Sequence, residues 1–253
     1  MKVLITGASS GIGRDLAREF AKLNNDLVIV ARNSDKLYEL KNELEDKYSI
    51  IVKIEPMDLN IEDNCYKLYH DNKDIDILIN NAGFGVFGEF INSDLDKELN
   101  LIKTNIVAVH ILTKLYLKDM VEKDKGKILN VASIAGNMPG PLMSSYYASK
   151  AYVLRLSEAI REELKRKKSK VKISVLEPGP VNTNFNNVAG VNFKVSSMTS
   201  EYVARYTIKR MFKGKFNIIP GFSIKCTKFF AKVIPDSLMA KMCFKIQEKR
   251  RMN

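Results

Sequence analysis

Two residues in the second half of the chain have the types and the spacing for proton transfer. Tyr146 and Lys150 are four residues apart within a stretch of helical periodicity (144–168), so their side chains lie on one helix face. A tyrosine hydroxyl has a pKa of about 10, and an ammonium group held beside it lowers that pKa by favouring the phenolate. The pair therefore predicts a general acid–base near neutral pH. Tyr147 has Ala151 four positions later and is expected to pack or to contact substrate.

A glycine-rich turn near the N-terminus has the sequence expected of a phosphate-binding site. It reads Thr6-Gly7-Ala8-Ser9-Ser10-Gly11-Ile12-Gly13, with an apolar run before it and helical periodicity after it. Glycines let the backbone turn tightly and approach a phosphate, while the helix N-terminus offers unpaired N–H groups and a positive dipole end. The spacing G-x-x-x-G-x-G differs from the commoner G-x-G-x-x-G. In this strand–turn–helix context it predicts dinucleotide binding rather than only a tight connection.

The end of the second apolar run distinguishes NADP from NAD. An acid there would hydrogen-bond the ribose 2′-hydroxyl of NAD and repel the 2′-phosphate of NADP. This chain has Ala31 at that place and Arg32 beside it. A guanidinium pairs with a phosphate in a forked geometry and stacks on adenine, and the Ser9 hydroxyl adds a further contact. We therefore expect NADP(H) as the cofactor.

Alternating strands and helices must position these residues. Short, β-branched-rich apolar runs predict buried strands at residues 2–5, 27–30, 50–54, 75–79, 127–131 and 171–176. Helical periodicity predicts helices at residues 11–23, 34–48, 61–72, 95–118 and 144–168. This alternation is typical of a parallel sheet with helices on both faces. The expected fold class is α/β, a single-domain Rossmann-type doubly wound parallel sheet.

These motifs together resemble the short, single-domain branch of the short-chain dehydrogenase/reductase family over residues 2–216. The glycine turn is followed, in the family's order, by Asn80-Asn81-Ala82-Gly83, Asn105, Ser133, and Tyr146 with Lys150. A fainter similarity links the chain to bacterial DltE-like reductases and to membrane-associated acyl or steroid reductases. The resemblance implies an NADP-dependent oxidoreductase that interconverts a carbonyl and an alcohol.

The resemblance also implies a role for each catalytic residue. Tyr146 would be the acid/base, and Ser133 would hydrogen-bond the substrate oxygen and stabilise its developing charge. Lys150 would bind the nicotinamide ribose as well as lower the pKa of the tyrosine. Asn105 would hold a helix kink and a water for proton relay.

Further loops are implied in cofactor binding. Asp58 and Leu59 resemble the family's adenine-contacting pair, Asp58 also being a candidate helix N-cap. Asn81 and Gly83 resemble the floor beneath the adenosine ribose, and residues 178–183 the loop that touches the nicotinamide carboxamide and the diphosphate. The expected cofactor contacts are Gly7, Ser9, Ser10, Gly11, Ile12, Gly13, Arg32, Asp58, Leu59, Asn81, Ala82, Gly83, Tyr146, Lys150, Pro178, Gly179, Val181 and Thr183.

Composition excludes several other classes of protein. The 253 residues are 45% hydrophobic and 28% charged, which suits one globular domain. Three scattered cysteines without a CxxC spacing argue against a disulfide framework, and two isolated histidines argue against a metal site. The first apolar run is too short for a signal peptide. The uncharged stretch 128–149 contains too many Gly, Pro, Asn and Ser residues for a membrane-spanning helix. A cytoplasmic protein is expected.

Substrate selection is expected to depend on the last third of the chain. The catalytic domain is placed at residues 1–221, with a substrate lid at about 184–215. Apolar residues recur in that lid, which favours a hydrophobic ketone or aldehyde: Phe185, Val188, Val191, Phe193, Val195 and Met198.

The remaining residues, 222–253, are predicted to form a basic amphipathic tail. Residues 208–253 hold twelve Lys and Arg against Asp236 and Glu248, which is +10 of the net +12. A helical wheel puts Lys225, Lys228 and Lys232 on one face of a first helix, and a second helix is expected to follow Pro235. The tail either covers the substrate cleft or a partner subunit, which we favour, or lies on an anionic membrane.

Other functions fit less well. A non-catalytic dinucleotide-binding sensor or scaffold is the main alternative, but the whole tetrad of Asn105, Ser133, Tyr146 and Lys150 is present. Nucleic-acid binding is disfavoured because apolar residues interleave with the charges of the tail. Extended sugar epimerases share the Tyr-x-x-x-Lys pair but need a longer chain. The expected partners are a small carbonyl or alcohol substrate and further copies of the chain in a homo-oligomer (dimer or tetramer).

Overall fold

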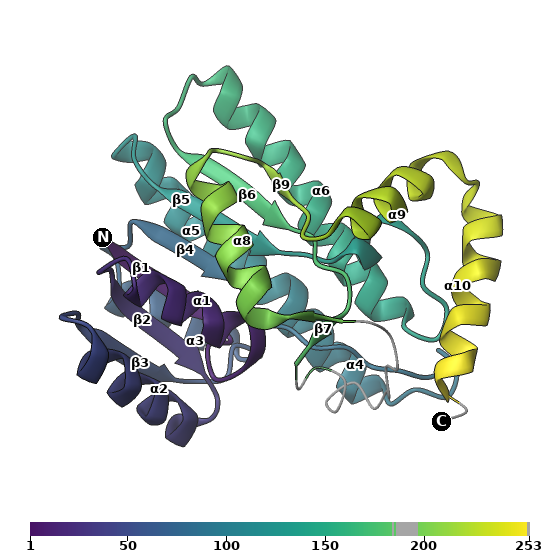
Figure 1. The fold of residues 1–253 in the computed structure, drawn as a ribbon, viewed down its shortest axis with the longest axis horizontal. Coiled ribbons are helices and arrows are strands. Elements are labelled where there is room, and N and C mark those ends of the chain that lie inside the picture. The colour runs from purple at the N-terminus through teal and green to yellow at the C-terminus, as the bar shows by residue number, and fades with distance from the viewer. Residues whose placement is uncertain (184, 186–196, 252–253) are drawn as a thin grey trace.

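A seven-stranded parallel sheet forms the centre of the molecule (Figure 1). The computed structural model describes residues 1–183, 185 and 197–251, without the side chains of the last two. The strands are β1 (Lys2–Thr6), β2 (Asp26–Ala31), β3 (Val52–Pro56), β4 (Ile77–Asn80), β5 (Lys127–Val131), β6 (Lys172–Leu176) and β9 (Asn217–Ile218). Their order is β3-β2-β1-β4-β5-β6-β9, and every pairing between neighbours is parallel. The fold is therefore the expected Rossmann-type α/β arrangement.

Helices cover both faces of the sheet because its strands are apolar on both sides. One face packs against α1 (Gly11–Ala21), α2 (Ser34–Lys47) and α8 (Ser200–Phe212), and the other against α3 (Glu62–Asp71), α5 (Val109–Glu122) and α6 (Ser144–Arg166). Successive side chains of a strand point to opposite faces. In β1, Val3 and Ile5 accordingly enter the first core and Leu4 the second.

The order of the strands reverses between β1 and β4, and this reversal creates the site. From β1 the chain builds outward to β2 and β3, then returns to place β4 on the other side of β1. The connections after β1 and β4 therefore leave in opposite directions. In an open parallel sheet, ligands bind in the crevice at the carboxyl ends of the strands where this reversal occurs.

One expected helix is divided into three segments. The periodicity predicts a single helix at residues 95–118, but they form α4 (Leu95–Ile102), a π-helical segment η1 (Lys103–Ala108) and the start of α5. A π-helical turn is a local distortion that is frequent at functional sites. Here it carries Asn105, in agreement with the helix kink implied by the family resemblance.

The expected lid boundary is wrong in its second half. The sequence interpretation assigns residues 200–212 to the lid, but they form α8, whose Val203, Ala204 and Met211 are buried in the core shared with α1. Their apolar periodicity arises from packing against the sheet, not from covering a substrate. Val188, Val191, Phe193 and Val195 lie outside the described residues.

The tail forms two helices that pack against the domain. They are α9 (Phe222–Val233) and α10 (Asp236–Arg251), and Figure 1 shows them together at one end of the molecule, beyond β6 and β9. A two-stranded pairing of β7 (Val181–Asn182) with β8 (Met198–Thr199) and a 3₁₀ turn η2 (Ile134–Asn137) complete the elements near them. Ala231, Met239 and Cys243 form a small separate core between these helices.

Candidate active site

The glycine turn is held by close packing with two other loops. Gly7 and Gly11 have φ of +68° and +54°, a region that disfavours residues with a Cβ. A Cβ on Gly7 would lie 2.8 Å from the Ala82 Cα, and one on Gly11 would lie 2.9 Å from Thr183 Cγ2. The glycines thus let three loops meet at the N-terminus of α1. Gly13, an expected cofactor contact, lies beneath the turn and does not line the cavity described below.

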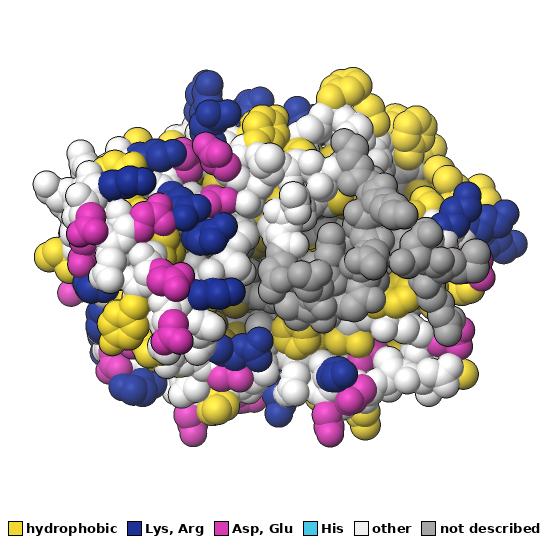
Figure 2. Space-filling view, turned by 60° about the horizontal axis from the view of Figure 1, so that its bottom comes forward, with side chains coloured by type: hydrophobic (Ala, Val, Ile, Leu, Met, Phe, Trp, Pro, Cys, Tyr) yellow, Lys and Arg dark blue, Asp and Glu magenta, His cyan; other side chains and the backbone are white. Residues whose placement is uncertain are grey.

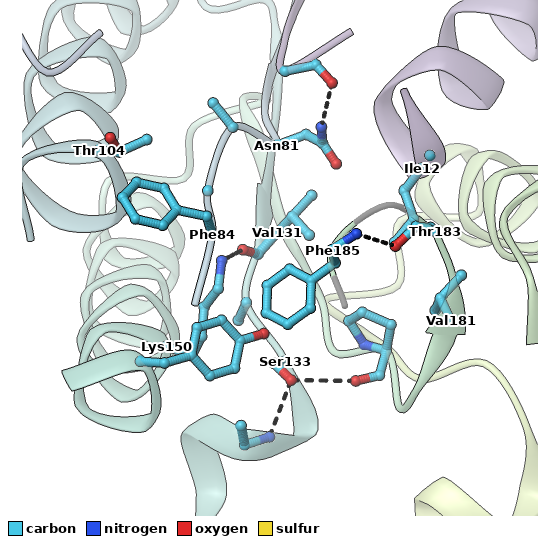
Figure 3. A pocket seen from close by; sticks show the side chains of 18 of the residues that line it. Ile12, Asn81, Phe84, Thr104, Val131, Ser133, Lys150, Val181, Thr183 and Phe185 are labelled. Atoms are coloured by element: carbon cyan, nitrogen blue, oxygen red, sulfur yellow. Dashed lines mark hydrogen bonds between the residues drawn. The ribbon is translucent and has the colours of Figure 1, made fainter. Parts of the chain in front are cut away.

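Asn81 holds the turn from the side of β4. Its amide nitrogen donates to the carbonyl oxygens of Thr6 and Gly7 at 2.9 and 3.2 Å, and its backbone N–H donates to Thr6 Oγ1 at 2.9 Å. Figure 3 shows the Asn81 side-chain nitrogen in one of these hydrogen bonds. The sequence predicts Asn81 as a floor for the adenosine ribose. In the structure its side-chain nitrogen holds the glycine turn, and Asn81 also lines the cavity described below.

The residues expected around the adenine lie at the ends of β2 and β3. Arg32 directly follows β2, is exposed, and pairs with no carboxylate among the described residues. The Asp58 carboxylate accepts from the Asn60 N–H at 3.0 Å, and Leu59 is buried. Asp58 does not cap α3, because the N-cap residue is Ile61.

Ser133, Tyr146 and Lys150 come together at the ends of β5 and α6. The Ser133 hydroxyl hydrogen-bonds to the Tyr146 hydroxyl, which favours the phenolate. It also contacts the Pro178 carbonyl oxygen at 3.4 Å and accepts from the Ala135 N–H at 3.2 Å. Lys150 Nζ donates to the Val131 carbonyl oxygen at 2.9 Å and lies 5.8 Å from the centre of the Tyr146 ring (Figure 3).

Burial dominates the proton affinities of this pair. Part of the Tyr146 ring is exposed, but protein surrounds its hydroxyl, and the loss of water raises the pKa to about 12 despite the Ser133 hydrogen bond. Burial lowers the pKa of Lys150 to about 8. In this arrangement Lys150 Nζ bonds to the Val131 carbonyl oxygen and desolvation dominates the pKa of Tyr146; that Lys150 lowers the tyrosine pKa during the reaction stays a prediction.

Asn105 lies behind the site rather than in it. Its side-chain nitrogen donates to the Phe84 carbonyl oxygen at 2.9 Å and to Ser149 Oγ at 3.0 Å, and its oxygen accepts from the Phe84 N–H at 3.1 Å. A Cβ on Gly83 would approach this oxygen to 2.9 Å and Lys150 Nζ to 3.3 Å. Asn105 is fully buried, does not line the cavity, and fixes the loop beside Lys150.

One cavity of about 500 Å³ joins these groups. All the expected cofactor contacts except Gly13 line it, from Arg32 at one end to Tyr146 and Lys150 at the other. Pro178, Gly179, Val181 and Thr183 form one wall. A second, mainly apolar part of the wall consists of Phe84, Met138, Met143, Tyr147, Phe185, Ile224, Thr227, Cys243, Ile246 and Gln247. Of these residues, the sequence interpretation singled out only Phe185, in the lid, and Tyr147, as a packing or substrate-contact residue.

The tail contributes directly to that wall. Ile224 and Thr227 of α9 and Cys243, Ile246 and Gln247 of α10 line the cavity, and Gln247 donates to the Tyr147 hydroxyl at 2.9 Å. The favoured sequence interpretation, a tail that covers the substrate cleft, agrees with this placement. The helical wheel puts Lys228 on one face with Lys225 and Lys232, but the three differ in the structure, because Lys228 is buried against Glu177 while the other two are exposed.

The described residues contain neither a group of His, Cys, Asp and Glu side chains suited to a metal nor a helix long and apolar enough to cross a membrane. Among the described residues, the cavity brings Ser133, Tyr146 and Lys150 together with the glycine turn, and Thr104 is a further polar residue of its lining.

Comparison with known proteins agrees with this geometry. Residues 1–218 match a family model described as short chain dehydrogenase. Over 170 residues the chain is 34% identical to a very-long-chain 3-oxoacyl-CoA reductase from Rattus norvegicus, covering 65% of this chain and 54% of that protein. The chain thus spans about half the length of this relative.

Two further proteins are matched over more of their length. An NADP-dependent 3-hydroxy acid dehydrogenase from Schizosaccharomyces pombe is 36% identical over 192 residues, which cover 74% of this chain and 73% of that protein. A short-chain dehydrogenase from Sphingobium yanoikuyae, solved in complex with NADPH, superposes with a TM-score of 0.83 at 30% identity and covers 87% of this chain and 88% of its own.

Proposed function

The chain belongs to the short-chain dehydrogenase/reductase family, and from that premise we propose that it interconverts a carbonyl and an alcohol with Tyr146 as the acid/base. It is an oxidoreductase that uses NADP(H). The observation that carries the proposal is one cavity that contains both the Ser133–Tyr146–Lys150 group and the glycine turn. A non-catalytic sensor is not favoured, because the named relatives are enzymes.

The residues at the turn fit the phosphates of a dinucleotide. The N-terminus of α1 opens onto the cavity, and the Ser10 side chain makes no capping hydrogen bond there. Arg32 and Ser9 would hold the 2′-phosphate, with Ala31 in place of a repelling acid. Lys150 would hold the nicotinamide ribose. When bound, NADPH supplies the hydride that reduces the carbonyl carbon.

Proton transfer in the reductive direction starts from a protonated tyrosine. With a pKa of about 12, Tyr146 keeps its proton at neutral pH. Its O–H bond breaks as the proton passes to the carbonyl oxygen, and the Ser133 hydroxyl stabilises the charge that develops on that oxygen by hydrogen bonding. The phenolate left on Tyr146 is stabilised by the nearby Lys150 ammonium and by Ser133. Solvent then returns the proton.

The substrate side of the cavity favours a hydrophobic carbonyl compound. Its wall combines Met138, Met143, Phe185, Ile224 and Ile246, with few polar groups besides Tyr147 and Gln247. Apolar walls with a small number of placed polar groups select apolar ligands. The rat and yeast relatives are named for 3-oxoacyl-CoA and 3-hydroxy acid substrates, respectively. An acyl chain that carries its carbonyl close to one end suits this cavity.

A screen of NADPH oxidation tests the proposal. We would compare ketones, aldehydes and 3-oxo thioesters of increasing acyl length, with Tyr146→Phe as the control protein. The proposal expects kcat/KM to rise with apolar length and expects Tyr146→Phe to be inactive while it still binds NADPH. Absence of NADPH oxidation with every carbonyl, or equal activity of Tyr146→Phe, would overturn it.

We further propose that the outer face of α9 and α10 contacts anionic membranes. One face of α9 closes the cavity, but Phe222, Phe229, Phe230 and Val233 are 54–81% exposed on the other. Leu238 and Met242 of α10 are also exposed, and five exposed lysines lie among these residues: Lys225, Lys232, Lys241, Lys245 and Lys249. Figure 2 shows hydrophobic side chains gathered at that end of the molecule, with Lys and Arg at the outer edge. Apolar insertion combined with basic contacts is typical of peripheral membrane binding.

Vesicle sedimentation tests this contact. The full chain should bind phosphatidylglycerol vesicles at low salt, bind less at high salt because salt screens the lysines, and bind neutral vesicles poorly. The double variant Phe229→Ser, Phe230→Ser should lose binding and retain activity on a water-soluble carbonyl. If the parent protein ignores the vesicles, or if the variant instead dissociates an oligomer, the face is a subunit interface.

A homo-oligomer and a cytoplasmic location also remain predictions. Leu95, Leu99 and Ile102 are 37–67% exposed at i, i+4 and i+7 of α4, which makes this helix our candidate subunit contact. Light scattering of the parent and of Leu99→Glu measures the mass of the assembly directly. A lower mass for the variant would support the contact.

A further inference from the structure

A buried ion pair joins α9 to the segment after β6. Lys228 Nζ lies 2.5 and 2.8 Å from the two carboxylate oxygens of Glu177. Glu177 is fully buried and Lys228 is 7% exposed. Removing two charges from water is so costly that apolar residues of similar size often stabilise a fold better. The pair is therefore poorly explained as a means of attaching the tail alone.

Glu177 and the residue after it contact the segment that carries Ser133 at two points. Pro178 presents its carbonyl oxygen to Ser133 Oγ at 3.4 Å and accepts from the Ile134 N–H at 3.0 Å. The Glu177 carboxylate accepts from Asn137 Nδ2 at 2.8 Å, and Asn137 ends the turn η2 that starts directly after Ser133. The backbone after Glu177 thus holds the start of this segment, and the carboxylate holds its end.

On its other side the pair sets the position of the cavity wall. Lys228 lies one turn after Ile224 and next to Thr227, both of which line the cavity. Ile224 packs so closely on Gly179 that a Cβ there would come within 2.3 Å of Ile224 Cδ1. A shift of Lys228 relative to Glu177 would therefore move the wall and the Ser133 segment together.

We infer that Glu177 and Lys228 are positioning residues for carbonyl reduction: they align Ser133 with the substrate wall that α9 provides. The inference rests on the proposed carbonyl chemistry of the same site. It means that the tail acts on the reacting end of the substrate as well as on its apolar end. Small displacements of a catalytic group away from its working geometry cost about a hundredfold in rate.

The test compares Lys228→Met with Lys213→Met, an exposed lysine that follows α8 and does not line the cavity. Rates are measured in vesicle-free buffer and expressed per NADPH-binding site, so that unfolded protein does not count. Lys228→Met should lower kcat by about tenfold to a hundredfold for short and long carbonyls alike. It should raise KM only for substrates long enough to reach α9 and leave NADPH binding unchanged, and Lys213→Met should match the parent.

A second variant separates misplaced charge from lost packing. In the double variant Glu177→Gln, Lys228→Met the buried charges are both gone, while the introduced side-chain amide oxygen still accepts from Asn137. Its kcat should therefore recover above that of Lys228→Met alone. A kcat for Lys228→Met equal to the parent value, or a loss confined to KM of long substrates, would overturn the inference. A parent protein without carbonyl reductase activity would instead overturn the proposed function.

Discussion

Carbonyl reduction should decline as the pH rises through about 8, because Lys150 then loses its proton. Burial depresses the pKa of Lys150 from the 10.5 of a free side chain to about 8. The ammonium is needed to stabilise the phenolate that forms on Tyr146, so the neutral amine should support the reaction poorly. The rate should be constant from pH 6 to 7, fall to half near pH 8, and drop about tenfold for each further unit.

The same shift predicts how Lys150 affects stability. A depressed pKa in the folded state means that the group contributes stability above pH 10.5, and that this stability is lost as the pH falls through about 8. The shift in the pKa of Lys150 from 10.5 to about 8 corresponds to about 3 kcal/mol in the free energy of unfolding. Losing the hydrogen bond to the Val131 carbonyl oxygen costs about 1 kcal/mol, so Lys150→Met should stabilise the protein at pH 7 by about 2 kcal/mol. The melting temperature should rise by about 4–8 °C.

Stopped-flow NADPH oxidation from pH 6 to 10 measures the pH dependence of the rate. Calorimetry measures the change in melting temperature of Lys150→Met. Lys150→Arg keeps its charge throughout, so its rate should stay flat beyond pH 9, and Lys150→Met should be slow at every pH. A parent rate that stays constant to pH 10 would refute the reasoning. So would a decline near pH 8 that persists in Lys150→Met, because another group would then be titrating.

Four substitutions test other parts of the site. Tyr146→Phe should lose carbonyl reduction by about 10²–10⁴-fold, whereas Tyr147→Phe, which removes the hydrogen bond with Gln247, should change KM more than kcat; the opposite ranking would move the acid/base to Tyr147. Arg32→Ala should raise KM for NADPH by about tenfold to a hundredfold and leave KM for NADH nearly unchanged; a parent enzyme that uses both cofactors equally would contradict this. Gly83→Ala places a Cβ 2.9 Å from Asn105 Oδ1 and 3.3 Å from Lys150 Nζ, and should lower both the melting temperature and kcat, as monitored by calorimetry and single-turnover rates.

Local signals predict the parts of the site that depend on short spacings. Tyr146 and Lys150 share a helix face because they are four residues apart, and the glycine turn follows from one strand leading into one helix. The sequence also predicts the first strand, β1, to within one residue, at 2–5 against Lys2–Thr6. It predicts strand β3 two residues early, at 50–54 instead of Val52–Pro56, because Ile50 and Ile51 continue the apolar run outside the sheet.

Properties that depend on tertiary structure cannot be predicted from local sequence patterns. The pKa of Tyr146 moves upward because of what surrounds its hydroxyl, and spacing along a helix does not report on burial. Glu177 and Lys228 are 51 residues apart, and on a helical wheel Lys228 looks like its exposed neighbours. The apolar residues of α8 give the same pattern whether they pack on a sheet or over a substrate.

The ion pair between Glu177 and Lys228 also constrains how the enzyme can be re-engineered. The part matched by the family model ends at residue 218, so α9 and α10 look like an exchangeable module for altering substrate range. A graft that brings only a new apolar wall would leave the Glu177 carboxylate buried without its cation. Libraries in which the tail is recombined between relatives should therefore be enriched, after selection, for grafts that restore a positive charge at this point or neutralise residue 177. A new tail can therefore change the substrate range only if the charge at residue 177 remains balanced.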